Sequence, residues 1–124
     1  MAPKILIVED EPNIVVPLRF LMEQNGYSVH VATTGEEAVA SVPEVAPDVV
    51  LLDIMLSGMD GFEVCQSIRE TPEGRSARIV FITAMGRDVD MAKGLSLGAD
   101  GYITKPFSNA EVVEKIRGLI DLSE

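Results

Sequence analysis

Four short apolar runs of the chain are each followed by residues whose side chains can do chemistry. In chain order, these polar residues are Glu9 and Asp10, then Asp53, Thr83 and Lys105. A carboxylate can act as a nucleophile, an ammonium can neutralise negative charge, and a hydroxyl can donate a hydrogen bond. None of them is informative alone, but together they predict a site that handles a phosphoryl group.

Three carboxylates at one place repel one another, and some would take up protons unless a cation intervened. Mg²⁺ is a hard ion that prefers six oxygen ligands and keeps several waters. We therefore expect Glu9, Asp10 and Asp53 to hold Mg²⁺, for which Mn²⁺ could substitute, with a backbone carbonyl from the loop after Asp53. Lys105 would pair with a carboxylate at rest and with phosphate after transfer.

Short runs rich in β-branched residues indicate buried strands, and helical periodicity fills the intervals between them. The predicted strands are residues 5–8, 28–31, 49–52, 79–82 and 102–103. The predicted helices cover about residues 14–22, 34–42, 60–68, 88–97 and 108–120. Capping patterns open three of these helices (Thr34 with Glu37, Asp60 with Glu63, Ser108 with Glu111), and Gly26 and Gly98 end two.

One proline conflicts with its surroundings. Pro17 lies inside the first helical pattern, where it removes a hydrogen bond and clashes one turn back. We expect either a distorted first turn or a helix that starts near Pro17.

Strands that alternate with helices predict a three-layer α/β fold. We expect residues 1–124 to form one domain with a doubly wound, parallel, five-stranded sheet of the flavodoxin-like order 2-1-3-4-5. In such sheets, ligands bind beyond the carboxyl ends of the strands, where the strand order reverses. The polar residues that follow the strands would therefore meet at one edge.

Composition excludes several classes of function. The formal net charge of −10 disfavours nucleic acid and anionic membrane surfaces as partners. Cys65 is the only cysteine and His30 the only histidine, so an internal disulfide is excluded and a catalytic thiol or histidine metal site is disfavoured. The start of the chain matches neither a signal peptide nor a membrane span, and a cytoplasmic location is expected.

The ordered set of motifs resembles the CheY-like receiver domains of two-component response regulators. The matching stretches are residues 8–11, 52–56 with 58–61, 83–84 and 98–107. They cover essentially the whole chain. Two positions depart from the common pattern: Ser57 replaces a proline, and the acidic pair is Glu-Asp in place of Asp-Asp.

The resemblance implies a role for each matching residue. Asp53 would be the phosphoacceptor, Asp10 the principal acidic metal ligand, and Glu9 its partner, often through water. The backbone carbonyl of Met55 would complete the protein ligands. The phosphoryl oxygens would be held by Thr83, Ala84 and Lys105. Tyr102 would be the switch aromatic, and Pro106 would follow a cis peptide bond.

The resemblance also implies partners and a mode of action. A sensor histidine kinase or a histidine phosphotransfer protein would donate the phosphoryl group. The domain would catalyse its own phosphorylation and slow dephosphorylation without being a turnover enzyme. The face formed by helix 88–97, strand 102–103 and the last helix would bind a target or a second copy of the chain.

Three alternatives compete with this reading. A dehalogenase-like phosphatase also uses an aspartate after a strand, but it needs an acid at the position of Met55. A flavodoxin-like flavin module needs a Ser/Thr/Gly-rich loop where this chain has Glu9 to Pro12. A degenerate receiver that only docks would not require the full set of site residues. The less favoured alternative for Tyr102 is an ordinary strand tyrosine.

Overall fold

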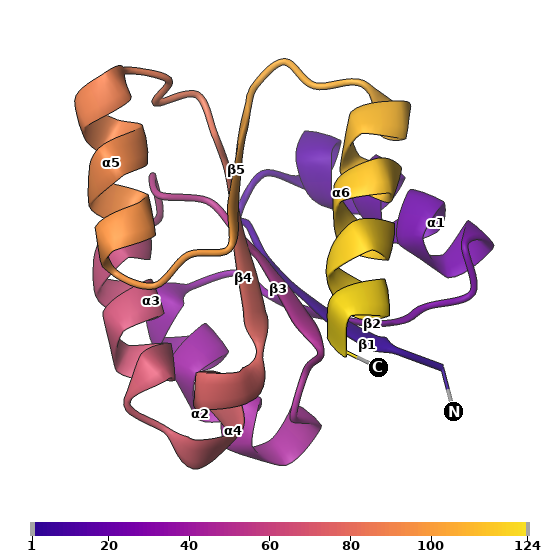
Figure 1. Ribbon diagram of the computed structural model, residues 1–124, viewed down its shortest axis with the longest axis horizontal. Coiled ribbons are helices and arrows are strands. Elements are labelled where there is room, and N and C mark those ends of the chain that lie inside the picture. Colours follow the sequence, from indigo (N-terminus) through magenta and orange to yellow (C-terminus); the bar gives the residue numbers. More distant parts are fainter. Residues whose placement is uncertain (1, 124) are drawn as a thin grey trace.

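Within residues 2–123, which the computed structural model describes, five strands form one parallel sheet (Figure 1). The strands are β1 (Lys4–Val8), β2 (Ser28–Ala32), β3 (Val49–Leu52), β4 (Arg78–Thr83) and β5 (Gly101–Thr104). Their spatial order is β2-β1-β3-β4-β5, and every neighbouring pair is parallel. The predicted fold class and strand order are confirmed.

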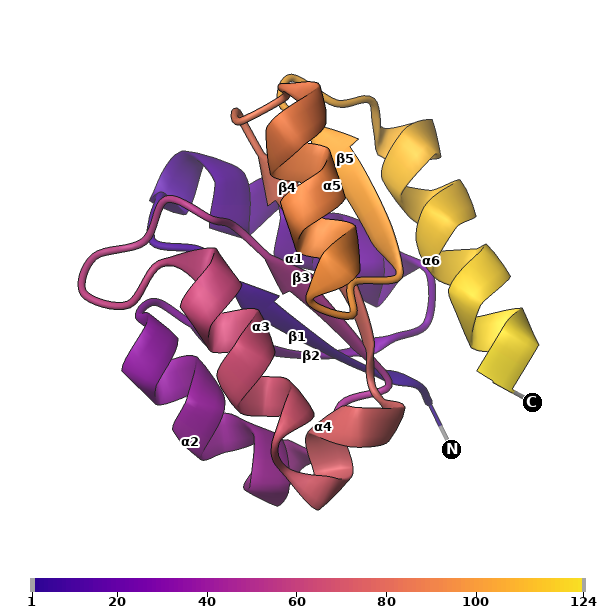
Figure 2. The same cartoon turned by 60° about the vertical axis from the view of Figure 1, so that its left-hand side comes forward.

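Helices cover both faces of the sheet, as right-handed crossovers between parallel strands require. They are α1 (Pro12–Gln24), α2 (Gly35–Val45), α3 (Gly61–Arg69), α4 (Pro72–Ser76), α5 (Asp88–Ser96) and α6 (Asn109–Ser123). α1 and α6 lie on one face, and α2, α3 and α5 lie on the other, with the short α4 below α3 (Figures 1 and 2). The result is the predicted three-layer arrangement.

Each face of the sheet has its own apolar core, because successive strand side chains point to opposite sides. In β1, Ile5 and Ile7 pack with the buried residues of α1 and α6. Leu6 and Val8 pack with the residues of α2 and α3 on the other face. All four are fully buried, which explains the continuous apolar run in the sequence.

The helix starts follow the predicted capping chemistry. Thr34, Asp60 and Ser108 each accept a hydrogen bond from the backbone N–H three residues later, at 3.1, 2.9 and 3.1 Å. Gly98 follows α5 with φ of +98°, a conformation that favours glycine at a helix end. Cys65 is a fully buried α3 residue, as expected, and burial raises the pKa of its thiol to about 11.

One of the two alternatives for Pro17 was wrong, and one short helix was not predicted. α1 begins at Pro12 and contains Pro17, so the helix does not start near Pro17. Proline is well accommodated at the first position of a helix, and Leu18 and Met22 then bury one face of α1 beyond Pro17. The five-residue α4 was not predicted, because a single turn of helix shows no periodicity.

Arg69 at the end of α3 joins three chain segments at the amino edge of the sheet. Its guanidinium donates to the carbonyl oxygens of Gly74 and Ala77 around α4, and to that of Gly98 after α5. It also pairs with Asp100 at 2.9 Å, where the Arg69 side chain is 20% exposed. A charged side chain that satisfies several carbonyls in this way is difficult to replace.

We expect Arg69→Met to lower the free energy of unfolding by about 3 kcal/mol, because it leaves the carbonyls without their donor and removes one of the two cations beside Asp100. Urea denaturation followed by circular dichroism measures the change. Arg19→Met is the control, since the Arg19–Glu23 pair is half-exposed and should contribute about 0.5 kcal/mol or less. Equal losses in the two variants would contradict the role of Arg69.

The structure also bears on membrane insertion. Over residues 2–123, no helix has the length and apolar character needed to cross a bilayer.

Candidate functional site

Strand register brings the polar residues together at the carboxyl edge of the sheet. Val8 of β1 lies beside Leu52 of β3, so the next residues, Glu9 and Asp53, are neighbours. The Asp53 amide donates to the Val8 carbonyl at 3.1 Å, which continues this pairing. β1 and β3 flank the point where the strand order reverses, the usual ligand position in such sheets.

Lys105 forms the central contact of the site. Its Nζ lies 2.7 Å from Glu9 Oε1 and 2.9 Å from Asp53 Oδ2, so one ammonium joins two carboxylates. The side chains of Glu9 and Asp53 are only 5% and 8% exposed. The backbone N–H of Lys105 donates to the Thr83 carbonyl, and the Lys105–Pro106 peptide bond is cis, as predicted.

The second oxygen of Glu9 is also engaged. Glu9 Oε2 accepts from the backbone N–H groups of Asp10 at 3.1 Å and Glu11 at 3.3 Å. The turn between β1 and α1 is therefore folded around the Glu9 carboxylate. Asp53 Oδ1 accepts a hydrogen bond from the Met55 amide at 3.1 Å.

Burial and the ion pairs shift the pKa values of these groups. Burial raises the pKa of Glu9, and the nearby charge of Asp53 adds to the increase, while the hydrogen bond from Lys105 opposes it. For Lys105, burial alone would lower the pKa, but the hydrogen bonds to Asp53 and Glu9 outweigh burial and raise it. Lys105 thus remains protonated, and it neutralises only one of the two carboxylates.

The other predicted metal ligands lie at the rim. Asp10 is exposed and directly follows Glu9, and Met55 is 64% exposed in the loop after Asp53. In the part of the chain that the structure describes, no group of three or more His, Cys, Asp or Glu side chains is placed to enclose a metal. Two carboxylates, a carbonyl and water still fit Mg²⁺, which keeps several waters in protein sites.

Thr83 and Ala84 end the adjacent strand. Thr83 is fully buried, and its Oγ1 accepts from the Met85 amide at 3.3 Å. Ala84 is exposed in the loop between β4 and α5. This loop and the loop after β5 both lie at the carboxyl edge, at the top of Figure 1.

Tyr102 links β5 to that loop. Its hydroxyl donates to the Met85 carbonyl, and its ring packs 5.8 Å from the Phe81 ring. Gly94 of α5 faces both rings, because a Cβ built there would lie 3.0 Å from Phe81 and 3.4 Å from Tyr102. The close approach of α5 to β5 therefore depends on the missing side chain of Gly94.

Gly61 makes a second close approach, beside Asp53 itself. A Cβ at Gly61 would lie 2.3 Å from the Asp53 carbonyl oxygen, and the Gly61 amide donates to the Ile54 carbonyl at 2.8 Å. The start of α3 is thereby held against the backbone of Asp53. The loop that precedes it extends away from the sheet in Figure 2.

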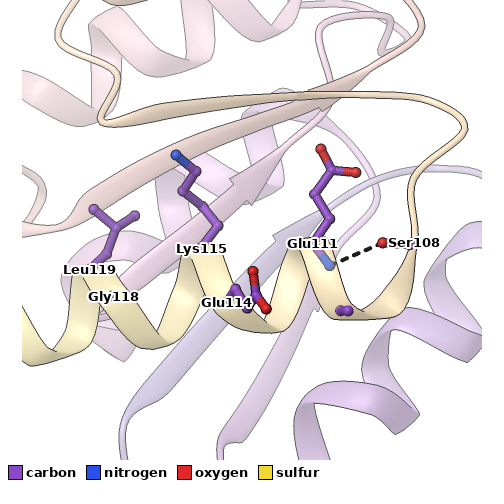
Figure 3. A pocket seen from close by; sticks show the side chains of 7 residues that line it. Ser108, Glu111, Glu114, Lys115, Gly118 and Leu119 are labelled. Atoms are coloured by element: carbon purple, nitrogen blue, oxygen red, sulfur yellow. Dashed lines mark hydrogen bonds between the residues drawn. The ribbon is translucent and has the colours of Figure 1, made fainter.

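Two of the surface hollows differ in how close they lie to Asp53. One of about 750 Å³ borders the Asp53 loop and α5, with an apolar lining that includes Ile54, Met55, Phe62 and Val89. The other, of about 650 Å³, is lined only by α6 and its cap Ser108 (Figure 3). Ser108 accepts there from the Glu111 amide, and none of the residues that line this hollow belongs to the Asp53 site.

Sequence reasoning missed several contacts in and around this site. It expected Lys105 to pair with a carboxylate, but it did not identify the double contact with Glu9 and Asp53. It also missed the ion pair of Arg87 with Asp90 at 3.0 Å, which opens α5. The spacing of Arg87 and Asp90 by three residues was the only signal for that pair.

The family model of the response regulator receiver domain matches residues 5–117. The chain belongs to this family. It is a receiver domain of the two-component response regulator type, and receiver domains are signalling domains and not classical turnover enzymes.

Solved receiver domains share its fold over nearly their whole length. A CheY-like receiver domain protein from Methanospirillum hungatei JF-1 is 28% identical, with coverage of 99% of this chain and 97% of that one and a TM-score of 0.93. A putative response regulator from Chloroflexus aurantiacus J-10-fl is 30% identical, with coverage of 98% and 99% and a TM-score of 0.91.

A third relative contains a metal. The receiver domain of a sensor histidine kinase from Pseudomonas aeruginosa PAO1 is 30% identical, with coverage of 98% of this chain and 99% of that one and a TM-score of 0.90. Its structure has a magnesium ion coordinated in the active site cleft.

The contacts of Lys105 predict a pH-dependent effect on stability. Lys105→Met leaves Glu9 and Asp53 buried without their cation, and should lower the free energy of unfolding by about 3 kcal/mol at pH 7.5. Because the pKa of Glu9 is already raised in the folded receiver, lowering the pH should protonate this carboxyl and reduce the loss. Urea denaturation at pH 7.5 and pH 4.5 measures both values, and an equal loss at both would contradict the prediction.

The packing of Gly94 predicts an unusual response to alanine. Gly118→Ala in α6 should raise the free energy of unfolding by about 1 kcal/mol, since the added Cβ would meet no described atom within 4 Å apart from its chain neighbours and the backbone of its own helix. Gly94→Ala should instead lower it by about 1 kcal/mol, because the Cβ displaces Phe81 or Tyr102. Thermal or urea unfolding of both variants tests this, and a gain in Gly94→Ala would refute the close packing.

Proposed function

We propose that Asp53 accepts a phosphoryl group from a phosphohistidine on a sensor histidine kinase or a histidine phosphotransfer protein. The observation that carries this proposal is the buried Asp53 carboxylate, held at the strand edge by the ammonium of Lys105. An Asp53 oxygen would form the new bond to phosphorus while the bond from phosphorus to the donor imidazole nitrogen breaks. The imidazole leaves with the electron pair and takes up a proton.

Catalysis of such a transfer depends mainly on positioning and charge neutralisation, so no general base is needed on this chain. The Met55 amide fixes Asp53 through Oδ1, while Lys105 holds Oδ2. Once the phosphoryl group is attached, Lys105 is near enough to exchange its contact with Asp53 for one with a phosphoryl oxygen. Thr83 and the Ala84 amide would hold the remaining oxygens.

The acidic edge also fits a divalent cation, as the magnesium-containing relative supports. Asp10, Asp53 and the Met55 carbonyl would hold Mg²⁺, or Mn²⁺ in its place, with Glu9 beside them. When bound, the ion would neutralise negative charge on the transferred group. Asp10 and Met55 are exposed at the rim, so the ion could enter from solvent.

The switch would run through Thr83 and Tyr102. If the Thr83 hydroxyl turns to the phosphoryl group, the Met85 amide would lose its acceptor. Tyr102 donates to the carbonyl of the same residue, so the change at Thr83 would reach Tyr102 through Met85. Movement of this loop would change the face formed by α5, β5 and α6, which would meet an output domain, a target or a second copy. The single buried Cys65 is compatible with action in the cytoplasm.

Mass spectrometry after incubation with acetyl phosphate and Mg²⁺ tests the proposal. The wild-type receiver should gain one phosphoryl group, and Asp53→Asn should gain none, because an amide is no nucleophile here. Chelation of Mg²⁺ with EDTA should reduce the gain strongly.

Asp88→Asn is the matched control, since it makes the same chemical change at an exposed position on α5. It should be phosphorylated like the wild type. An unmodified wild type in the presence of Mg²⁺, or a modified Asp53→Asn, would refute Asp53 as the phosphoacceptor. Steady turnover of p-nitrophenyl phosphate would favour the phosphatase alternative.

A further inference from the structure

The apolar hollow of about 750 Å³ between the Asp53 loop and α5 is not accounted for by the proposed phosphoryl transfer. Its lining includes the buried side chains of Ile54 and Phe62, and Met85 from the loop after β4. Met55 and Val89 also line it, and each is 64% exposed. They are two of the five large apolar side chains that the described residues expose to solvent. Exposed apolar side chains gathered around a hollow indicate a ligand site, whereas single scattered ones do not.

One cation beside this hollow has no ion-pair partner. Lys93 Nζ lies 4.5 Å from the centre of the Phe62 ring, and among the described residues no carboxylate is within ion-pair distance of it. The two acids of the lining are already engaged, because Asp90 pairs with Arg87 at 3.0 Å and Asp60 caps the start of α3. The aromatic ring therefore holds an ammonium at the apolar surface, where a negatively charged group would complement it.

We propose that the hollow binds a small soluble amphipathic carboxylate, with its apolar part against Ile54 and Phe62 and its carboxylate on Lys93. The volume lies within the range of small-molecule sites, about 300–1,000 Å³, and a mostly apolar lining with a few polar groups is typical of them. Methionine side chains are flexible, so Met55 and Met85 can adapt to the shape of the ligand. The net charge of −10 disfavours an anionic bilayer as the source of such a molecule.

The ligand would contact both loops that flank the phosphoacceptor. Met55 and Met85 line the hollow from opposite loops, after β3 and after β4. The Met55 amide donates to Asp53 Oδ1, and the Met85 amide donates to Thr83 Oγ1. Binding should therefore be detectable at the backbone amides of these two methionines.

Octanoate is a suitable probe, because it joins one carboxylate to a flexible apolar chain. Nuclear magnetic resonance of the ¹⁵N-labelled protein follows its binding at individual amides. We expect saturable shifts at Met55, Met85 and Val89, with a Kd on the order of 1 mM for so small a ligand. Octanol and octylammonium have the same chain without the negative charge, and each should bind about tenfold more weakly. Equal or tighter binding of octylammonium would overturn the proposal.

Two pairs of variants locate the site, and all four changes lie at exposed positions. Lys93→Met keeps an apolar stem and removes the charge, so it should weaken octanoate binding about tenfold. Lys115→Met makes the same change beside the α6 hollow and should bind like the wild type. Val89→Asn should weaken binding about fivefold, whereas Leu95→Asn, on the same helix but outside the lining, should not. Wild-type affinity in Lys93→Met would refute the contact with Lys93.

Three further results would overturn the proposal. The absence of saturable shifts up to about 20 mM octanoate would show that the hollow takes no such ligand. Sedimentation of the protein with phosphatidylglycerol vesicles would make a bilayer the occupant. Shifts of the same amides on dilution of the unliganded protein would make a second copy the occupant. None of these readouts uses a phosphoryl donor, so failure of acetyl phosphate to modify Asp53 would count against the proposed function alone.

Discussion

The ammonium of Lys105 between two buried carboxylates is the interaction on which the rest of this receiver domain depends. Glu9 and Asp53 follow adjacent parallel strands, so the sheet forces two negative charges close together. Two like charges with so little solvent would otherwise favour protonation of one carboxyl. Lys105, brought from the far end of the chain, neutralises one charge and leaves the edge negative, as a site for a divalent cation requires.

Much of the surrounding structure maintains this arrangement. Gly61 allows α3 to pack against the Asp53 backbone, and the Lys105 amide extends the pairing of β4 with β5. The buried residues on both faces of the sheet fix the strand register that sets the positions of the polar groups. The electrostatic repulsion among the carboxylates is therefore confined to the edge of the sheet, where solvent and a cation can reach them.

The same edge connects chemistry with a surface that can signal. Thr83 and Tyr102 bind the amide and the carbonyl of one residue, Met85, in the loop that leads into α5. α5 approaches β5 closely only because Gly94 has no side chain. A contiguous series of hydrogen bonds thus runs from Asp53 through Lys105 and the loop after β4 to the Tyr102 ring beside α5.

The sequence by itself determined most element types, the parallel doubly wound class of the sheet and the chemistry of the edge. Continuous apolar runs, capping residues and the residues after each run are local features, and they identify Asp53, Asp10, Thr83 and Lys105 as site residues. Local features failed where periodicity was absent, as in α4, or where burial outweighed an unfavourable residue, as at Pro17 in α1.

Only the tertiary structure decided which groups touch. Glu9 and Lys105 are 96 residues apart, and no spacing rule predicts that both Glu9 and Asp53 bind the same ammonium. The same holds for Arg69, which binds Asp100 and several backbone carbonyls of a kind that every residue carries. The physical reason is that local sequence sets secondary structure, whereas the partner of a charged side chain depends on how distant strands and loops meet in space.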